Sequence, residues 1–291
     1  MSDFSGRVVL ITGAGKGIGK SYAEWFAARG AKVVVNNRSH PGVPSSAQAV
    51  ADQICRSGGI AIADEHSVED ESGNHAMVET AIREFGRLDI LICNAAISAE
   101  RMPIESTPME RMRQVMAINF YSCVYSLQAA LPGMIKQDYG RIVLTGSASG
   151  FYGQRGNAAY GASKTALIGL ARCVAYDNRG RNIFINIVNP YARTEMAKAI
   201  DPKFSELLAP KKVAPVVGYL CSDACRSAGK IYAVGAGRVR AVAISDGPVS
   251  EVDDDNFDTV VPEVKPEPGL FTPTSSENSS LGLIPEITAN R

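Results

Sequence analysis

The chain has 291 residues, of which 45% are hydrophobic and 21% are charged. These proportions are typical of a folded globular protein and exclude a wholly disordered one. Thirty basic residues balance thirty acidic ones, so no net positive charge attracts nucleic acid or anionic lipid, and neither is expected as a partner. No run reaches the roughly eighteen apolar residues of a membrane-spanning helix.

The cysteines and histidines predict neither a disulfide framework nor a metal site. Cys221 and Cys225 lie close together in the sequence, but His40, His66 and His75 all lie in the first third of the chain. Free, buried thiols are therefore the better interpretation, and they favour a reducing compartment. The first residues, MSDFSGRVVL, have no signal-peptide pattern. We therefore expect a cytoplasmic location.

Short β-branched runs alternate with longer helical patterns through most of the chain. Strands are expected at 7–12, 32–36, 60–63, 89–93, 141–145, 183–188 and 230–234, and helices near 18–29, 45–58, 70–86, 108–137, 158–179 and 212–224. The strand runs show little polar alternation, which is typical of parallel strands covered on both faces. The pattern predicts a Rossmann-like, doubly wound α/β sheet of about seven strands with helices on both faces.

The alternating pattern stops near Gly247. Residues 248–291 are acidic and rich in proline and serine, a composition that buries too little apolar surface to offset the entropy of ordering. We expect one domain over residues 1–247 and an extended tail over 248–291.

The first expected strand ends in a glycine-rich loop, ITGAGKGIGK. Gly13, Gly17 and Gly19 form T-G-x-x-x-G-x-G, which leads directly into the first expected helix. Such a loop lets the backbone approach a pyrophosphate, and the helix N-terminus offers unpaired N–H groups. A glycine cluster alone is often an ordinary turn, but its place between a strand and a helix indicates nucleotide binding.

Polar residues follow two later strands and interrupt one helix. Asn94 and Ala95 follow the fourth strand, and Ser147 follows the fifth, at the strand ends where open α/β sheets bind ligands. Asn119 lies inside a long apolar helix pattern, although asparagine is a mediocre helix former. We expect Asn119 to be buried and to have a specific partner.

Tyr160 and Lys164 are four residues apart on one expected helix. Residues at this spacing are neighbours on a helix surface. Taken alone, the two are best interpreted as a solvated pair, and only the rest of the pattern favours a catalytic one.

Taken together, these motifs resemble the short-chain dehydrogenase/reductase family over about residues 5–247. YGRIVLTGSASGFYGQRGNAAYGASK and PKKVAPVVGYLCS are, more closely, similar to the hydroxyacyl-CoA dehydrogenase domain of peroxisomal multifunctional enzymes and to their stand-alone bacterial relatives. The resemblance implies that Tyr160 is the general acid/base and that Lys164 lowers the pKa of its phenol. It implies further that Ser147 bonds the substrate oxygen, and that Asn119 anchors a water relaying protons to Lys164.

The same resemblance implies an NAD(P) cofactor and no metal. The implied cofactor-binding residues are Gly13, Lys16, Gly17, Ile18, Gly19, Asn37, Arg38, Val68, Asn94, Ala95, Tyr160, Lys164, Pro190 and Thr194.

The sequence departs from the family pattern at three places, of which the mildest is NAAI in place of the commoner NNAG, a change that keeps Asn94. Pro190-Tyr191 replaces the usual Pro-Gly after the sixth strand, and the segment to Thr194 is one residue short. The third-strand loop has His66 where an aspartate that contacts adenine is common, so Val68 is the better candidate for that contact.

NADP is the expected cofactor because no carboxylate follows the second strand. An acidic residue there binds the adenosine ribose in NAD sites and repels a 2′-phosphate. Here the strand leads into Asn37 and Arg38, and Arg38 with Lys16 suits a phosphate. A solvated loop arginine is the alternative, so NAD use stays open.

The expected reaction interconverts a secondary alcohol and a ketone of a small-molecule substrate. The substrate is a 3-hydroxyacyl or 3-oxoacyl thioester, or alternatively a hydroxysteroid or another bulky hydrophobic ketone. A non-catalytic nucleotide sensor is a remote alternative. Helices 108–137 and 158–179 are apolar around much of their circumference, so we expect a homo-dimer or homo-tetramer.

Overall fold

The computed structural model of the chain describes residues 3–98, 100–195 and 201–244. At its centre is one eight-stranded sheet in the order β3-β2-β1-β4-β5-β6-β7-β8. The strands are β1 (Val8–Ile11), β2 (Lys32–Asn36), β3 (Ile60–Asp64), β4 (Ile90–Cys93), β5 (Gly140–Thr145), β6 (Ile183–Tyr191), β7 (Ile231–Gly235) and β8 (Arg238–Val242). β1 to β7 are parallel, which confirms the predicted doubly wound fold.

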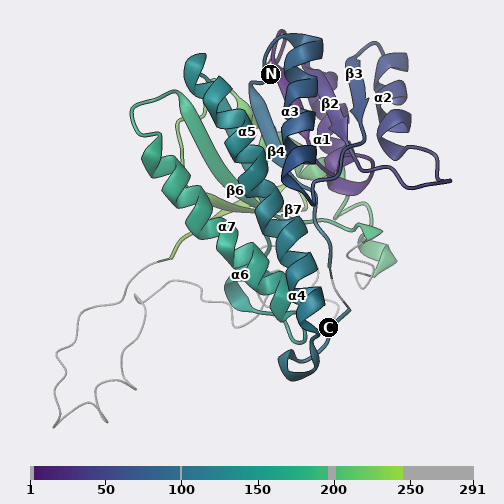
Figure 1. Cartoon of the computed structure of the whole chain (residues 1–291), viewed down its shortest axis with the longest axis vertical. Coiled ribbons are helices and arrows are strands. Elements are labelled where there is room, and N and C mark those ends of the chain that lie inside the picture. Colours follow the sequence, from purple (N-terminus) through teal and green to yellow (C-terminus); the bar gives the residue numbers. More distant parts are fainter. Residues whose placement is uncertain (1–2, 99, 196–200, 245–291) are drawn as a thin grey trace.

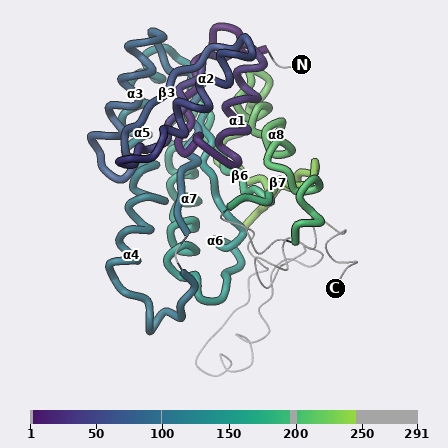
Figure 2. Tube along the Cα trace, turned by 90° about the vertical axis from the view of Figure 1, so that its right-hand side faces the viewer, coloured from purple at the N-terminus to yellow at the C-terminus, as the bar shows by residue number. Residues whose placement is uncertain are grey.

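Helices cover both faces of the sheet, as Figures 1 and 2 show. One face is covered by α1 (Gly17–Ala27), α2 (Ser46–Arg56) and α8 (Ala214–Cys221), and the other by α3 (Glu71–Phe85), α5 (Ser122–Lys136) and α7 (Ala158–Asp177). Each face has its own apolar core. In β1, Val9 and Ile11 pack against the first set of helices, whereas Val8 and Leu10 pack against the second. Burial on both faces explains why the strands are continuously apolar.

The eighth strand was not predicted from the sequence. β8 turns back beside β7 through Ala236 and Gly237, whose φ angles are 52° and 74°. Two positive φ angles are typical of the tight turns that join antiparallel strands. β8 has a charged, largely exposed sequence at the sheet edge, so it lacks the apolar run by which the other strands were recognised.

The long helix predicted over 108–137 has three parts. They are α4 (Met109–Met116), a π-helical turn (Ala117–Tyr121) and α5. A π-turn bulges out of the regular helix and often marks a functional position, and Asn119 lies in its middle. A short helix, α6 (Ser149–Tyr152), follows β5 and was also not predicted.

The predicted tail, residues 248–291, lies outside the described residues. Among the residues that are described, no helix combines the length and apolar character needed to span a bilayer.

Candidate active site at the carboxyl ends of the strands

Tyr160 and Lys164 lie on the first turns of α7, beside the end of β5. Lys164 is only 3% exposed. Its Nζ donates a hydrogen bond of 2.7 Å to the backbone oxygen of Thr145 and lies 5.7 Å from the centre of the Tyr160 ring. The two side chains therefore form a close pair, with Lys164 buried and Tyr160 partly buried, rather than the solvated pair that the spacing alone favours.

Burial governs the ionisation of this pair. It lowers the pKa of Lys164 to about 8, although the nearby thiols of Cys123 and Cys93 partly favour its charged form. It raises the pKa of Tyr160, against which the hydrogen bond with Ser147 acts in the opposite direction. The expected lowering of the Tyr160 pKa is therefore not found in the protein alone, because the loss of water around the phenol outweighs its partners.

Ser147 lies directly beside Tyr160. It follows β5, and its Oγ accepts a hydrogen bond of 3.2 Å from the backbone N–H of Ser149 at the start of α6. The same hydroxyl bonds the phenol of Tyr160. A phenol and a hydroxyl that touch at a strand end can both reach one oxygen atom of a bound molecule.

Asn119 is fully buried, as the sequence predicts, and its amide binds protein atoms. Its Oδ1 accepts from the backbone N–H of Ile97 at 2.8 Å, and its Nδ2 donates to the backbone oxygen of Ile97 at 3.0 Å. Nδ2 also donates to Ser163 Oγ at 3.1 Å. Asn119 therefore joins the segment after β4 to α7, one residue before Lys164.

The glycine loop between β1 and α1 has a backbone conformation that requires glycine. Gly13 and Gly17 have φ angles of 64° and 59°, which side chains disfavour. A Cβ on Gly13 would also lie 2.8 Å from Ala95 Cα. α1 begins at Gly17 with no side-chain cap and no acidic residue in its first turn. Its first N–H groups, those of Gly17, Ile18 and Gly19, thus suit an anion.

Asn94 and Ala95 support this loop. The Asn94 Nδ2 donates to the backbone oxygens of Thr12 and Gly13 at 3.0 and 3.2 Å. The Thr12 hydroxyl accepts from the N–H groups of both Asn94 and Ala95 at 3.0 Å. Asn94 thus anchors the glycine loop to the end of β4.

The two cations predicted to meet a 2′-phosphate both have carboxylate partners. Lys16 pairs with Glu195 at 2.6 Å, and Arg38 pairs with Glu69 at 3.4 Å. The Asn37 side chain also has a partner within the protein, because its Nδ2 donates a hydrogen bond to Ser46 Oγ at 2.9 Å.

The loop after β3 is organised by Asp64. Its buried carboxylate accepts from Asn36 Nδ2 at 2.7 Å and lies 2.9 Å from His66 Nδ1. His66 is half-exposed. Val68 packs into the core, so the sequence-predicted adenine contact lies at the inner edge of this loop.

β6 continues through Pro190 to Tyr191, where the family pattern has a glycine. Tyr191 packs against a small apolar cluster that contains Leu208 and Ala233. Thr194 reaches the glycine loop, since a Cβ on Gly17 would lie 3.6 Å from its Cγ2. Pro190 and Thr194 therefore border the same strand end as the glycine loop. Residues 196–200, which follow Thr194 and Glu195, lie outside the described residues.

Four residues around the site were not singled out from the sequence. Three of them bond residues more than forty positions away in the chain, and Ser46 bonds Asn37 nine positions away. Only the glycine-loop threonine had a local signal, its place in T-G-x-x-x-G-x-G. They are Thr12, Ser46, Ser163 and Glu195.

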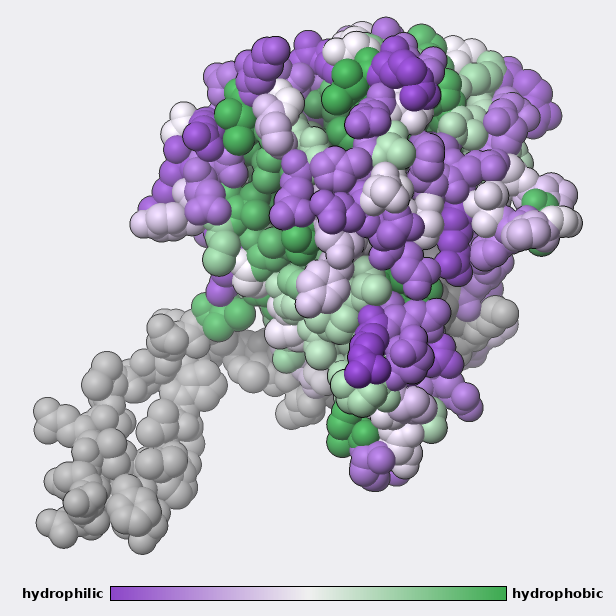
Figure 3. Space-filling view, viewed as in Figure 1, coloured by the Kyte–Doolittle hydropathy of each residue, from purple (hydrophilic) through white to green (hydrophobic). Residues whose placement is uncertain are grey.

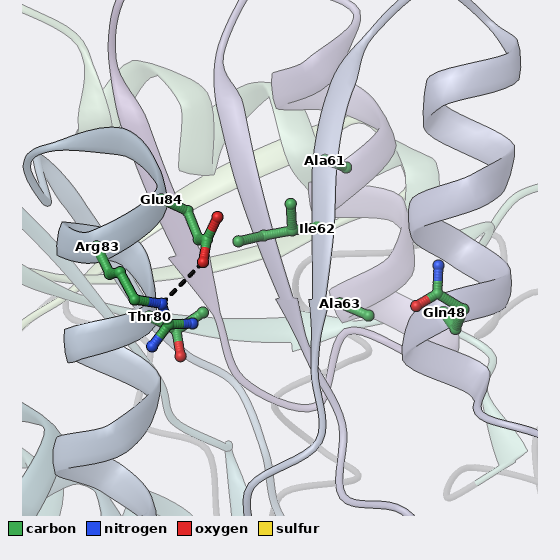
Figure 4. Close-up of a pocket in the computed structure, with 7 residues that line it drawn as sticks. All are labelled: Gln48, Ala61, Ile62, Ala63, Thr80, Arg83 and Glu84. Atoms are coloured by element: carbon green, nitrogen blue, oxygen red, sulfur yellow. Dashed lines mark hydrogen bonds and ion pairs between the residues drawn. The ribbon is translucent and has the colours of Figure 1, made fainter.

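A separate surface hollow of about 330 Å³ lies along the edge strand β3, between α2 and α3. Figure 4 shows Ile62 and Ala63 beside Thr80, Gln48 and the Arg83–Glu84 pair. None of these residues belongs to the site described above. Within the described part of the chain, no cluster of three or more histidine, cysteine or acidic side chains is placed to hold a metal ion.

Comparison with known proteins identifies the family. A model of the short chain dehydrogenases matches residues 7–204. The chain belongs to this family. This short-chain dehydrogenase is 42% identical to peroxisomal multifunctional enzyme type 2 of Drosophila melanogaster over 80% of its length, and spans 40% of that relative.

Two further relatives match most of their own length. The 3-oxoacyl-[acyl-carrier-protein] reductase of Escherichia coli is 33% identical, over 76% of this chain and 92% of that protein. A crystal structure of a short chain dehydrogenase from Mycobacterium avium is 33% identical, with a TM-score of 0.81, and covers 91% of this chain and 97% of that one. The chain is therefore an oxidoreductase, and its family implies a nicotinamide cofactor, NAD or NADP.

The buried ammonium predicts a specific dependence of stability on pH. Because folding lowers the pKa of Lys164 from 10.5 to about 8, the unfolded chain binds more protons between these values. Below pH 8 the buried cation destabilises the folded state to its full extent, and this destabilisation disappears as the pH rises toward 10.5. Without added nucleotide, the free energy of unfolding of wild type should rise by about 1–2 kcal/mol relative to that of Lys164→Met between pH 7.5 and 9.5.

Urea unfolding of both proteins at the two pH values measures this difference, and groups that titrate in both proteins cancel. If the difference in unfolding free energy between wild type and Lys164→Met stays constant with pH, the pKa of the ammonium is not lowered by folding.

Proposed function

We propose that this dehydrogenase prefers NADP(H) and interconverts a 3-hydroxyacyl and a 3-oxoacyl thioester. The observation that carries the reaction is the contact of Tyr160 with Ser147 above the buried Lys164 at the end of β5. The nicotinamide cofactor, when bound, supplies or accepts the hydride. The protein supplies the proton and the geometry.

In the reducing direction Tyr160 Oη gives its proton to the carbonyl oxygen while Ser147 Oγ donates a hydrogen bond to the same oxygen. The raised pKa of Tyr160 keeps the phenol protonated at neutral pH, which is the form that this step requires. In the oxidising direction the phenolate accepts the alcohol proton, and the nearby Lys164 cation stabilises it. Asn119 acts as a positioning residue, because its bonds to Ile97 and Ser163 hold the two walls of the site together.

Tyr160→Phe should reduce kcat by at least about a hundredfold, because removing a positioned proton donor costs that much. Nucleotide affinity should remain nearly unchanged, because the ring is kept. Lys164→Ala should impair both, since the proposed role of the lysine includes the nicotinamide ribose. Steady-state kinetics and nucleotide titration measure the two effects.

Tyr176→Phe is a matched control, because Tyr176 lies on the same helix and is 64% exposed. Retention of more than a few per cent of kcat in Tyr160→Phe would overturn the proton-donor assignment.

The thioester substrate is supported by the relatives. The Escherichia coli relative is a 3-oxoacyl-[acyl-carrier-protein] reductase. Turnover of 3-oxoacyl thioesters, steroid ketones and small ketones, followed by nucleotide absorbance, separates the substrate classes. Efficient turnover of the steroids alone would contradict the thioester assignment.

The preference for NADP rests on the residues at the end of β2. Asn37 and Arg38 follow the strand and no carboxylate stands among them. The ion pairs Lys16–Glu195 and Arg38–Glu69 compete with a 2′-phosphate for the same cations. Their side chains are 41% to 68% exposed, and pairs this exposed contribute only about 0–1 kcal/mol. A charge-assisted bond to a phosphate is worth about 1.5–3 kcal/mol, so the phosphate is favoured.

We expect wild type to prefer NADP by about ten- to a hundredfold in kcat/KM, which corresponds to one such bond. Arg38→Ala and Asn37→Asp should both shift the preference toward NAD, the first by removing a cation and the second by adding a repelling carboxylate. Measuring kcat/KM with each nucleotide tests this, with Arg56→Ala on the exposed end of α2 as the control. A wild-type preference for NAD of tenfold or more would contradict the proposal.

We further propose a homo-oligomer, a dimer or tetramer, that covers α5 and α7. Figure 3 shows apolar side chains gathered over this face. Of eight large apolar residues on α4, α5 and α7, three are buried in the chain's own core: Val115, Leu127 and Leu167. The remaining five are only partly buried: Met116, Val124, Leu131, Leu170 and Val174. Sedimentation at micromolar concentration should give a dimer or tetramer, and a monomer would contradict the proposal.

The division at residue 247 and the cytoplasmic location remain proposals as well. All six cysteines are free thiols, which supports a reducing compartment. Limited proteolysis that removes residues 248–291 and leaves activity intact would support the division, and fractionation of cells would test the location.

A further inference from the structure

Two loops meet beside the start of α7 and bring two arginines together. Met102 N–H donates to the backbone oxygen of Gly156 at 2.8 Å, which joins the loop after β4 to the α6–α7 connection. Gly156 has a φ of 70°. A Cβ there would lie 3.1 Å from Met102 N and 3.3 Å from Arg101 Cβ. The glycine thus allows the close approach that places Arg101 beside Arg155. Both views show this end of the molecule below α4 and α6 (Figures 1 and 2).

A surface hollow of about 290 Å³ lies between the loops. It is lined by Arg101, Pro103, Arg155 and Gly156. Within the described part of the chain, neither guanidinium forms an ion pair with an acidic side chain, and the neighbouring Glu100 is not paired with them. Two unpaired guanidinium groups beside one hollow form a site for an anion with several oxygen atoms, because each presents a planar fork of donors.

The hollow is held in place by side-chain hydrogen bonds. Gln154 Oε1 accepts from Asn157 Nδ2 at 2.8 Å and from Ser149 Oγ at 3.2 Å. These bonds fix both ends of the short loop that carries Arg155. Asn157 is 8% exposed and directly precedes α7, and Arg155 lies five residues before Tyr160 in the sequence.

We propose that Arg101 and Arg155 bind the phosphate of a phosphopantetheine-type acyl thioester while its carbonyl lies at Tyr160. This inference rests on the proposed function and names the group of the substrate that is recognised away from the reaction. The hollow is smaller than a pocket that encloses a whole drug-sized ligand, roughly 300–1,000 Å³, and it suits one phosphate with part of its linker. Coenzyme A and an acyl carrier share this group. An uncharged steroid has no phosphate for the two arginines to bind.

The test compares three thioesters that carry the same 3-oxoacyl group. They are the N-acetylcysteamine thioester, which has no phosphate, the 4′-phosphopantetheine thioester and the coenzyme A thioester. For the double variant Arg101→Gln/Arg155→Gln, we expect KM for both phosphate-bearing thioesters to rise about ten- to a hundredfold, the loss of one or two charge-assisted bonds. KM for the N-acetylcysteamine thioester and kcat for all three should change less than about twofold.

Arg113→Gln is the matched control, because Arg113 lies on the nearby α4 but already pairs with Glu110 at 3.8 Å. It removes one positive charge from this end of the molecule without touching the hollow, and should leave every KM unchanged. Calorimetric titration with free coenzyme A gives a readout independent of turnover, and the double variant should bind it about ten- to a hundredfold more weakly.

Each outcome decides between the two proposals. A KM effect on the coenzyme A thioester alone would move recognition to the nucleotide phosphates and overturn the shared-phosphate assignment. Equal losses with all three thioesters, or none with any, would overturn the arginine site while the proposed function stands. Wild type that turns over none of the three would instead overturn the proposed function. Thermal unfolding of the double variant confirms that it is folded.

Discussion

The Lys164 ammonium lies almost entirely out of water, with the backbone oxygen of Thr145 as its hydrogen-bond acceptor at 2.7 Å. Burying a cation is costly unless it is paired, and its pKa falls accordingly. In the proposed mechanism this cost is offset by the function of the ammonium, which lies 5.7 Å from the centre of the Tyr160 ring. The bond to Thr145 also joins α7 to the end of β5, so one interaction sets both the electrostatics of the site and the position of the helix that carries it.

The remaining parts of the site are held by side chains that bond backbone atoms. The side-chain amide of Asn119 forms hydrogen bonds with both the N–H and the backbone oxygen of Ile97. Hydrogen bonds of Thr12 and Asn94 connect the loop after β1 to the loop after β4. Loops at strand ends have few ladder bonds of their own. Buried amides and hydroxyls therefore take over that task and satisfy backbone groups that burial would otherwise leave unpaired. The π-turn at Asn119 is consistent with this role, because a bulge redirects one side chain without ending the helix.

The four cations assigned here to anion binding fall into two groups. Lys16 and Arg38, around the proposed cofactor site, each have a carboxylate partner, so an incoming phosphate must compete with weak, exposed pairs. Arg101 and Arg155 line a hollow and have no such partner among the described residues. The first group is suited to moderate selectivity between nucleotides. The second is suited to holding an anion outright.

Most of the fold was predictable because its signals are local. The apolar runs of β1 to β7, the glycine loop and the four-residue spacing of Tyr160 and Lys164 are set by neighbours in the chain. β8 escaped prediction because its charged edge sequence has no apolar pattern. The burial and partners of Asn119 were anticipated only in part, since the sequence indicates that a buried amide needs partners but not which ones.

The sequence by itself determined the seven parallel strands of the sheet, the order of the motifs and most of the residues that meet at its carboxyl edge. Only the tertiary structure decided which charge state these residues favour and which residues they contact. Burial by distant elements raises the pKa of Tyr160, Glu195 reaches Lys16 across the chain, and a glycine lets Arg155 stand beside Arg101. Desolvation and ion pairing depend on distances between segments far apart in the sequence, and no local pattern contains those distances.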